Sequence, residues 1–279
     1  MNPLLNQMSN DFLSIMKSKE SILGAWNFGS VTHSLDDEYS DVDLIFFVEG
    51  KSFGEINNTL ITYLEKICDE VVLCWPEVFN SEAITNYGFL LKKEEILLQF
   101  DVFLLNSYKM DDFMCRIHYT DLRKENVFFD KVGDVEKLIK TAPKGEIWKA
   151  DINNLYDTYW FHMNMTIKYI KRKDFFKLNN VMRILMDTHV SLLLAGYDCI
   201  TWGGTANKLH FIPKEKQEHI MRYGCSQNFE MNMKHLLQDM KWFAEDYKDV
   251  CNLTGIKYDE KIANEIMNNW NEKMKLHTI

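Results

Sequence analysis

The chain has 279 residues, and its 32 Lys and Arg against 41 Asp and Glu give a formal net charge of −9. Binding to duplex nucleic acid depends on basic side chains that neutralise phosphates, so this balance argues against a general nucleic-acid binder. Hydrophobic residues make up 46% of the chain, too many for a disordered protein, and the length predicts two domains or one large one.

The six cysteines show neither zinc-binding nor redox spacing, and in a chain of this size they indicate free thiols of a reducing compartment. No apolar run approaches about 18 residues, so we expect no membrane span and no membrane partner. The first residues lack the basic start and apolar core of a secretory signal. Together these features predict a cytoplasmic protein.

The first half of the chain alternates helical and extended patterns. Apolar residues at helical spacing predict helices, and short runs rich in β-branched and aromatic residues predict strands. In chain order we expect a helix over 3–18, strands over 22–28 and 41–48, a helix over 52–67, strands over 71–75, 87–91 and 96–105, a helix over 107–116, a strand over 126–129 and a helix over 134–141.

The second half carries helical patterns with few strand signals. We expect helices over 146–172, 174–195, 214–224, 228–251 and 258–276. The segment 143–145, Pro-Lys-Gly, is the best candidate for a linker. The fold class predicted is α+β, with a mixed-sheet domain over 1–142 followed by an α-helical bundle over 143–279.

The most informative local feature is the acidic stretch 36–43, in which five of eight residues are Asp or Glu. Asp41 and Asp43 are two residues apart at the start of a strand, so they project to the same face. Two such carboxylates repel each other unless a cation lies between them, and Mg²⁺ prefers oxygen ligands of this kind. The bland alternative is a solvated acidic turn that leads into a strand.

Two further features extend this candidate site. Gly29 and Ser30 precede the acidic stretch, and a glycine turn with hydroxyl and amide donors can hold the outer phosphates of a nucleotide. Asp101 is the single acid in an otherwise apolar strand, where it shares a face with Gln99. If that strand lies beside 42–48, Asp101 completes a three-carboxylate site; otherwise it is only an edge residue.

These residues carry a family resemblance. An apolar residue followed by Gly29-Ser30, a gap of ten residues, and Asp41-Val42-Asp43-Leu44 resembles the motif of the nucleotidyltransferase superfamily. The later strand with Asp101 and the helical second half resemble the aminoglycoside and lincosamide adenylyltransferases, which act on antibiotics. The resemblance covers most of the chain and implies a nucleotidyltransferase catalytic domain followed by a helical substrate-binding domain.

The resemblance also implies an activity. Such enzymes use Mg²⁺ and ATP to move AMP to a hydroxyl of a small molecule, with release of pyrophosphate. By this likeness Asp41 and Asp43 hold Mg²⁺, and Asp101 binds the metal or acts as general base. Gly29 and Ser30 would bind the outer phosphates. Lys168, in the first helix of the second half, would reach the triphosphate, although a solvated helix end is the commoner role of such a lysine.

Two other functions stay open at this point. A nucleotidyltransferase of the toxin–antitoxin type would share the fold and modify a protein or an RNA, although the net charge weighs against RNA. A nucleotide sensor would bind without transfer, although three retained carboxylates weigh against it. The expected partners are therefore ATP and a small hydroxylated acceptor, in a monomer or homodimer. His33, His162 and His189 are expected to be solvated or core histidines, not ligands.

Overall fold

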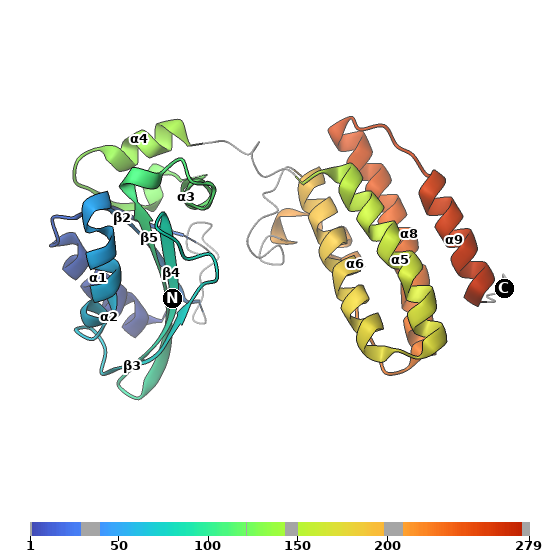
Figure 1. Ribbon diagram of the computed structural model, residues 1–279, viewed down its shortest axis with the longest axis horizontal. Helices are drawn as coiled ribbons and strands as arrows, with labels where there is room; N and C mark the ends of the chain where they lie inside the picture. The colour runs from blue at the N-terminus through green and yellow to red at the C-terminus, as the bar shows by residue number, and fades with distance from the viewer. Residues whose placement is uncertain (1, 29–39, 121, 143–149, 198–208, 275–279) are drawn as a thin grey trace. The chain divides into compact units, whose positions relative to one another are not determined.

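The computed structural model describes residues 2–28, 40–120, 122–142, 150–197 and 209–274 (Figure 1). The chain divides into two compact units, Met1–Lys144 and Gly145–Ile279, and each is described by itself. The first unit is a sheet with helices and the second is helical, so the predicted α+β class is confirmed.

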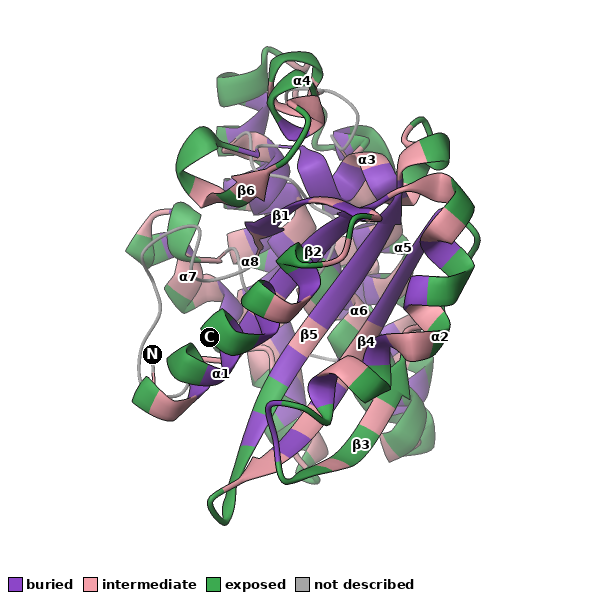
Figure 2. Ribbon diagram, turned by 90° about the vertical axis from the view of Figure 1, so that its left-hand side faces the viewer, coloured by how far each residue is buried: buried purple, intermediate pink, exposed green. Residues whose placement is uncertain are grey.

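The first unit is built on a six-stranded mixed sheet with the strand order β3-β4-β5-β2-β1-β6. The central pair β2 and β5 is parallel, whereas the other four neighbouring pairs are antiparallel. Figure 2 shows that β2 is largely buried, whereas β3 at the sheet edge is largely exposed. The strands span Ile22–Asn27 (β1), Val42–Val48 (β2), Glu70–Pro76 (β3), Ile84–Lys93 (β4), Ile96–Asn106 (β5) and Val127–Asp130 (β6).

One face of this sheet is covered by two helices, α1 (Pro3–Lys17) and α2 (Phe53–Leu64). The side chain of Asn2 accepts a hydrogen bond from the Leu4 amide, and Pro3 occupies the first turn, which explains why α1 begins there. The apolar faces of both helices pack on alternate residues of the central strands, including Leu44 and Phe46. This layer forms the larger core of the unit.

The opposite face carries α3 (Phe113–Tyr119) and α4 (Asp134–Thr141), which contribute to a second core with Ile45, Phe47 and Phe103. The helix predicted over 107–116 was wrong as a single element. The chain forms a 3₁₀ turn over Ser107–Lys109, and α3 begins afterwards because Asp112 caps it by accepting a hydrogen bond from the Met114 amide.

In its described residues the second unit has three long helices and two shorter ones; four of them contribute to one main core, and the shortest packs in a smaller cluster. Tyr159 and Phe243 stack at its centre with ring centroids 3.5 Å apart. The helices span Ile152–Arg172 (α5), Phe175–Gly196 (α6), Lys214–Ile220 (α7), Phe229–Thr254 (α8) and Lys261–Met274 (α9).

Gly196 ends α6 and shows how closely that helix approaches α8. A Cβ at this position would lie 2.5 Å from Cγ2 of Val250, so only glycine fits without a shift. The five cysteines within the described ranges are free, as predicted. Within those ranges, none of the helices combines the length and the apolar character that crossing a bilayer requires.

Candidate active site

The two acidic strands lie side by side. β2 and β5 pair in parallel, and Asp43 is the direct partner of Asp101 in their register. Residues directly opposite on neighbouring strands point to the same side of a sheet, so the two carboxyl groups share one face. Asp41 lies two residues before Asp43. The expectation that the Asp101 strand neighbours 42–48 is therefore confirmed.

The three carboxylates lie on the sheet face that α3 and α4 cover further along the strands. Ile45 and Phe47 follow Asp43 on that face, and both are buried in the core with these helices. Asp43 and Asp101, by contrast, are only half-buried. The acidic groups therefore lie where α3 and α4 no longer cover the sheet, between the packed core and the accessible surface.

Gln99 joins two of the acids. Its side-chain amide donates hydrogen bonds to Oδ2 of Asp41 at 3.0 Å and to Oδ2 of Asp101 at 2.9 Å. Gln99 was predicted to share the face of Asp101, but the sequence alone assigned it no role. An amide donor between two carboxylates reduces their repulsion without neutralising their charge.

The pKa values of Asp43 and Asp101 reflect both their burial and the remaining repulsion among the carboxylates. Burial, with a smaller contribution from Asp41 and Asp101, raises the pKa of Asp43 from 3.8 to about 8. Burial also raises the pKa of Asp101. The hydrogen bond from Gln99 lowers this pKa in part, and the charge of Asp41 adds to the rise. Among the described residues, no lysine or arginine forms an ion pair with any of the three. The cluster is therefore a place where positive charge is favoured.

The donor set suits a hard divalent cation, although its present arrangement is not that of a metal site. In the described ranges, no group of three or more His, Cys, Asp or Glu side chains is placed to hold a metal ion. Gln99 occupies one oxygen each of Asp41 and Asp101. The chemistry of the oxygens fits Mg²⁺, and Asp41 and Asp101 each have a second oxygen that Gln99 does not bind.

Gly88 makes room beside Asp101. In the register of β4 and β5, Gly88 is the direct partner of Asp101. A Cβ at Gly88 would lie 3.1 Å from Oδ1 of Asp101 and 3.7 Å from Cε3 of Trp75. The missing side chain therefore lets a carboxylate and an indole lie close to the same backbone position. Neither Gly88 nor Trp75 was among the residues predicted from sequence, because strand register is not visible there.

The described structure does not test the other predicted site residues. Gly29 and Ser30 lie outside the described residues, as does His33, which was expected to be only a solvated loop histidine. Lys168 belongs to the second unit, where it is exposed and its ammonium lies 5.0 Å from the ring centroid of Tyr169. The roles of Gly29, Ser30 and Lys168 at a triphosphate therefore stay predictions.

A cavity of about 510 Å³ lies between α2 and β3, and none of the three carboxylates lines it. Of its acidic groups, Asp69 is already paired with Lys93 at 3.4 Å. A smaller cavity of about 100 Å³ lies beside the start of β2 and includes Asp43. We place the candidate site at the carboxylates because acidic groups of raised pKa converge there.

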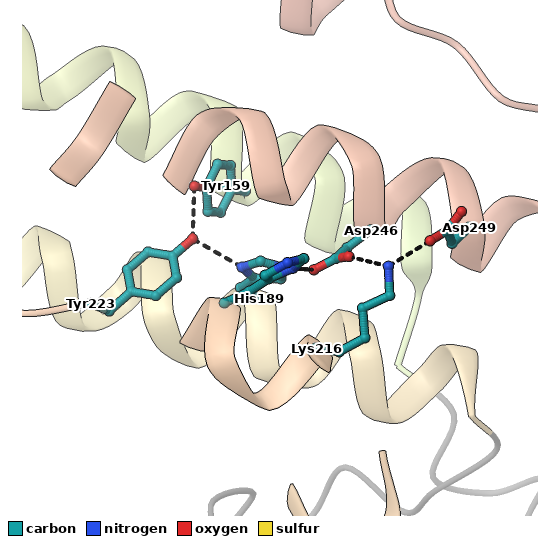
Figure 3. A network of polar contacts seen from close by, with 7 residues as sticks. Tyr159, His189, Lys216, Tyr223, Asp246 and Asp249 are labelled. Atoms are coloured by element: carbon teal, nitrogen blue, oxygen red, sulfur yellow. Dashed lines mark hydrogen bonds and ion pairs between the residues drawn. The ribbon is translucent and has the colours of Figure 1, made fainter. Parts of the chain in front are cut away.

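The second unit contains a separate polar network, shown in Figure 3. His189 is fully buried, with Nε2 2.8 Å from Asp246 and Nδ1 3.0 Å from the Tyr223 hydroxyl. Lys216 donates to Asp246 at 2.6 Å and to Asp249 at 2.5 Å. His189 is thus a core histidine with two partners, as expected. Despite burial, hydrogen bonds from His189, His219 and Lys216 hold the pKa of Asp246 at about 2.

Asp239 is one of three side chains of this unit with a buried polar atom that lacks a partner among the described residues; the others are Trp160 and His235. The side chain of Asp239 is fully buried, and neither carboxyl oxygen has a hydrogen-bond partner among the described residues. Burial raises its pKa to about 7, and the charge of Arg222 only partly opposes this rise. No sequence pattern pointed to Asp239, because an acid on a helix is normally exposed.

No protein-family model matches the chain, and no curated protein matches it either. Among solved structures, the chain is similar to the crystal structure of an aminoglycoside 6-adenyltransferase from Bacillus subtilis. The TM-score is 0.44 and the identity 13%, over 98% of this chain and 99% of that chain. At this TM-score and identity the similarity carries no argument about activity, and we base the proposed function on the carboxylate cluster.

Proposed function

We propose that the protein is a Mg²⁺-dependent nucleotidyltransferase that moves AMP from ATP to a hydroxyl of a small molecule. The observation that supports this most is the pairing of Asp43 with Asp101, with Asp41 close by and no basic partner among the described residues. Such a cluster costs stability as long as no cation is present, which favours a binding role over a structural one.

In this reaction the acceptor oxygen attacks the α-phosphorus of ATP. A new bond forms between that oxygen and phosphorus, and the bond from phosphorus to the oxygen of the leaving pyrophosphate breaks. The acceptor hydroxyl loses its proton, and we assign this proton to Asp101. Burial raises the pKa of Asp101 above the usual value for an aspartate, which suits a group that must take up a proton.

Asp41 and Asp43 would hold the metal ion, with Asp101 as a further ligand or as the base. Mg²⁺ bound there would supply neutralisation of charge on the phosphates. The residues of the chain orient the reactants: Gln99 holds Asp41 and Asp101 at a fixed spacing before any cation binds. Gly29 and Ser30 would bind the outer phosphates through a turn, and Lys168 would add a positive charge.

The acceptor we propose is an antibiotic of the aminoglycoside or lincosamide type. This choice follows from the motif of Gly29-Ser30 and Asp41-Val42-Asp43, which resembles that of the antibiotic adenylyltransferases. The net charge of −9 is compatible with a cationic acceptor such as an aminoglycoside.

The test is an incubation of the full chain with Mg²⁺ and ATP labelled in the α-phosphate. Aminoglycosides, lincosamides, a protein mixture and tRNA are offered in separate reactions, and products are read by mass spectrometry. We expect a mass gain of one AMP on at least one small molecule. Transfer only to protein or RNA would refute the acceptor class, and ATP binding without transfer would indicate a sensor.

The matched variants are Asp101→Asn and Asp11→Asn. Asp11 is an exposed acid of α1, so its substitution changes the net charge equally without touching the cluster. Asp101→Asn should lower kcat by about 10²–10⁴-fold, the usual contribution of a general base. Asp11→Asn should leave it unchanged. Equal activity in both variants would remove Asp101 from the mechanism.

A further inference from the structure

A row of side chains crosses the sheet through the candidate site. Trp75 on β3 is the direct partner of Gly88 on β4, Gly88 is the partner of Asp101 on β5, and Asp101 is the partner of Asp43 on β2. Direct partners share a face, so the indole of Trp75 lies on the same side as the carboxylates. Asp101 stands between Asp43 and Trp75 in this row.

Gly88 lets the indole and the carboxylate approach the same backbone position closely. A Cβ there would approach both Asp101 Oδ1, at 3.1 Å, and Trp75 Cε3, at 3.7 Å. Trp75 and Asp101 therefore lie on the two strands that neighbour Gly88, one on each side of it. A ligand that lies on the indole is within reach of Asp101 without any side chain in between.

The surface around Trp75 is apolar and exposed. Trp75 is 54% exposed, and Leu73, two residues before it on the same face, is 47% exposed. Leu73 shares this face because it pairs with Leu90, which in turn pairs with Gln99. Large apolar side chains clustered at an open surface beside a polar site are typical of a ligand-binding wall.

We propose that Trp75 is the platform on which the acceptor molecule lies, with Leu73 extending that platform. This inference rests on the proposed function and names its substrate class: a hydroxylated ring compound with one apolar face. The ring stacks its apolar face on the indole, and its hydroxyl points to Asp101.

The order of the row assigns this surface to the acceptor and not to the nucleotide. Asp43 lies on β2 and Asp41 directly before it, and as the proposed metal ligands they would hold an ion that neutralises the phosphates of ATP. The base must touch the attacking hydroxyl, which approaches the phosphorus from the side opposite the leaving group. Trp75 lies beyond Asp101 as seen from Asp43, which is the side of the attacking group. Glu77 near Asp101 makes this side acidic, and an acidic wall favours a neutral or cationic acceptor.

The test labels the protein with 5-fluorotryptophan and records ¹⁹F NMR spectra, with the Trp75 signal assigned by its loss in Trp75→Phe. Individual aminoglycosides and lincosamides are titrated in the presence of Mg²⁺ and a non-hydrolysable ATP analogue. We expect the Trp75 signal to shift and saturate with at least one compound, and not with the nucleotide alone. A signal moved only by nucleotide, or by none of the compounds, would overturn the inference.

Kinetics give a second readout on any compound that accepts AMP. Trp75→Ala should raise KM for the acceptor about tenfold, in line with the value of an aromatic contact, and leave kcat and KM for ATP unchanged. Trp75→Phe should recover part of the loss. Val72→Ala, at another exposed position of β3, serves as the control and should change neither constant. Unchanged acceptor KM in Trp75→Ala would refute the platform while the proposed transfer still stood.

The remaining outcomes separate the two proposals. A saturating Trp75 shift without any AMP transfer would refute the transfer reaction and support the binding surface. A Trp75 signal that depends on protein concentration would identify a second copy of the chain on this exposed edge strand, which would overturn the acceptor assignment.

Discussion

The replacement Asp43→Asn should stabilise the first unit near neutral pH. The pKa of Asp43 is raised from 3.8 to about 8, and each pKa unit corresponds to about 1.36 kcal/mol. At about pH 7.5 the unfolded chain has released this proton and the folded chain retains it. The difference of about 3.7 units gives an upper limit of about 5 kcal/mol. Because Asp43 is only half-buried, solvent screening reduces this upper limit, and we expect Asp43→Asn to raise the free energy of unfolding by ~2 kcal/mol.

The sign follows from proton binding. A folded-state pKa above the unfolded value means that the folded chain binds more protons, so stability falls as pH rises from about 4 to about 8. The gain from Asp43→Asn should therefore be near zero at pH 4 and grow toward pH 8. Mg²⁺ should stabilise the natural protein and have little effect on the variant.

The assay is unfolding in urea, monitored by hydrogen exchange in peptides from β2 and β5. This readout reports on the first unit alone. Asp11→Asn is the control, because it removes one acid from an exposed position of the same unit. A stability difference that does not change with pH, or a variant less stable than the natural protein at pH 7.5, would refute the reasoning.

Three further substitutions probe the structure. Gly88→Val should press on Asp101 and lower AMP transfer by tenfold or more, while circular dichroism shows an unchanged fold; full activity would contradict the close approach. Asp246→Asn should cost about 3–5 kcal/mol in urea unfolding, because it removes the buried charge that binds His189, His219 and Lys216, and Lys216 keeps only the exposed Asp249; a loss below about 1 kcal/mol would show that the network is not structural. Asp239→Leu should stabilise the second unit at pH 8 more than at pH 5, because its raised pKa of about 7 makes the ionised form costly; the reverse trend would exclude this.

The part of the site that could be predicted from sequence lies on two strands with strong local patterns. The run 42–48 is rich in β-branched and aromatic residues, and Asp41 and Asp43 at its start are two apart, which fixes their common face. Asp101 is conspicuous because it is a lone acid in an apolar strand. In each case the information lies within about ten neighbouring residues.

The residues that were missed depend on contacts between distant segments. Gly88 and Trp75 matter only because β3, β4 and β5 pair in one particular register, and a shift by one residue would turn Trp75 to the other face. Asp239 and Asp246 look like ordinary surface acids of a helix until the neighbouring helices bury them. The break at Asp112 was missed because a capping aspartate competes locally with the helix pattern around it.

The polar network of the second unit determines which of its helices separates first in acid. α7 has seven residues and is held to α8 by Lys216 and His219, both of which bind Asp246. Tyr159 of α5 stacks on Phe243 of α8, and apolar side chains of α6 belong to the same core, so these contacts do not depend on Asp246 even though His189 of α6 also binds it. As pH falls toward 2, protonation of Asp246 weakens the polar attachment of α7, whose one buried apolar side chain is Ile220. We therefore expect the unit to lose cooperativity in acid: α7 detaches as a separate segment while α5, α6 and α8 stay packed.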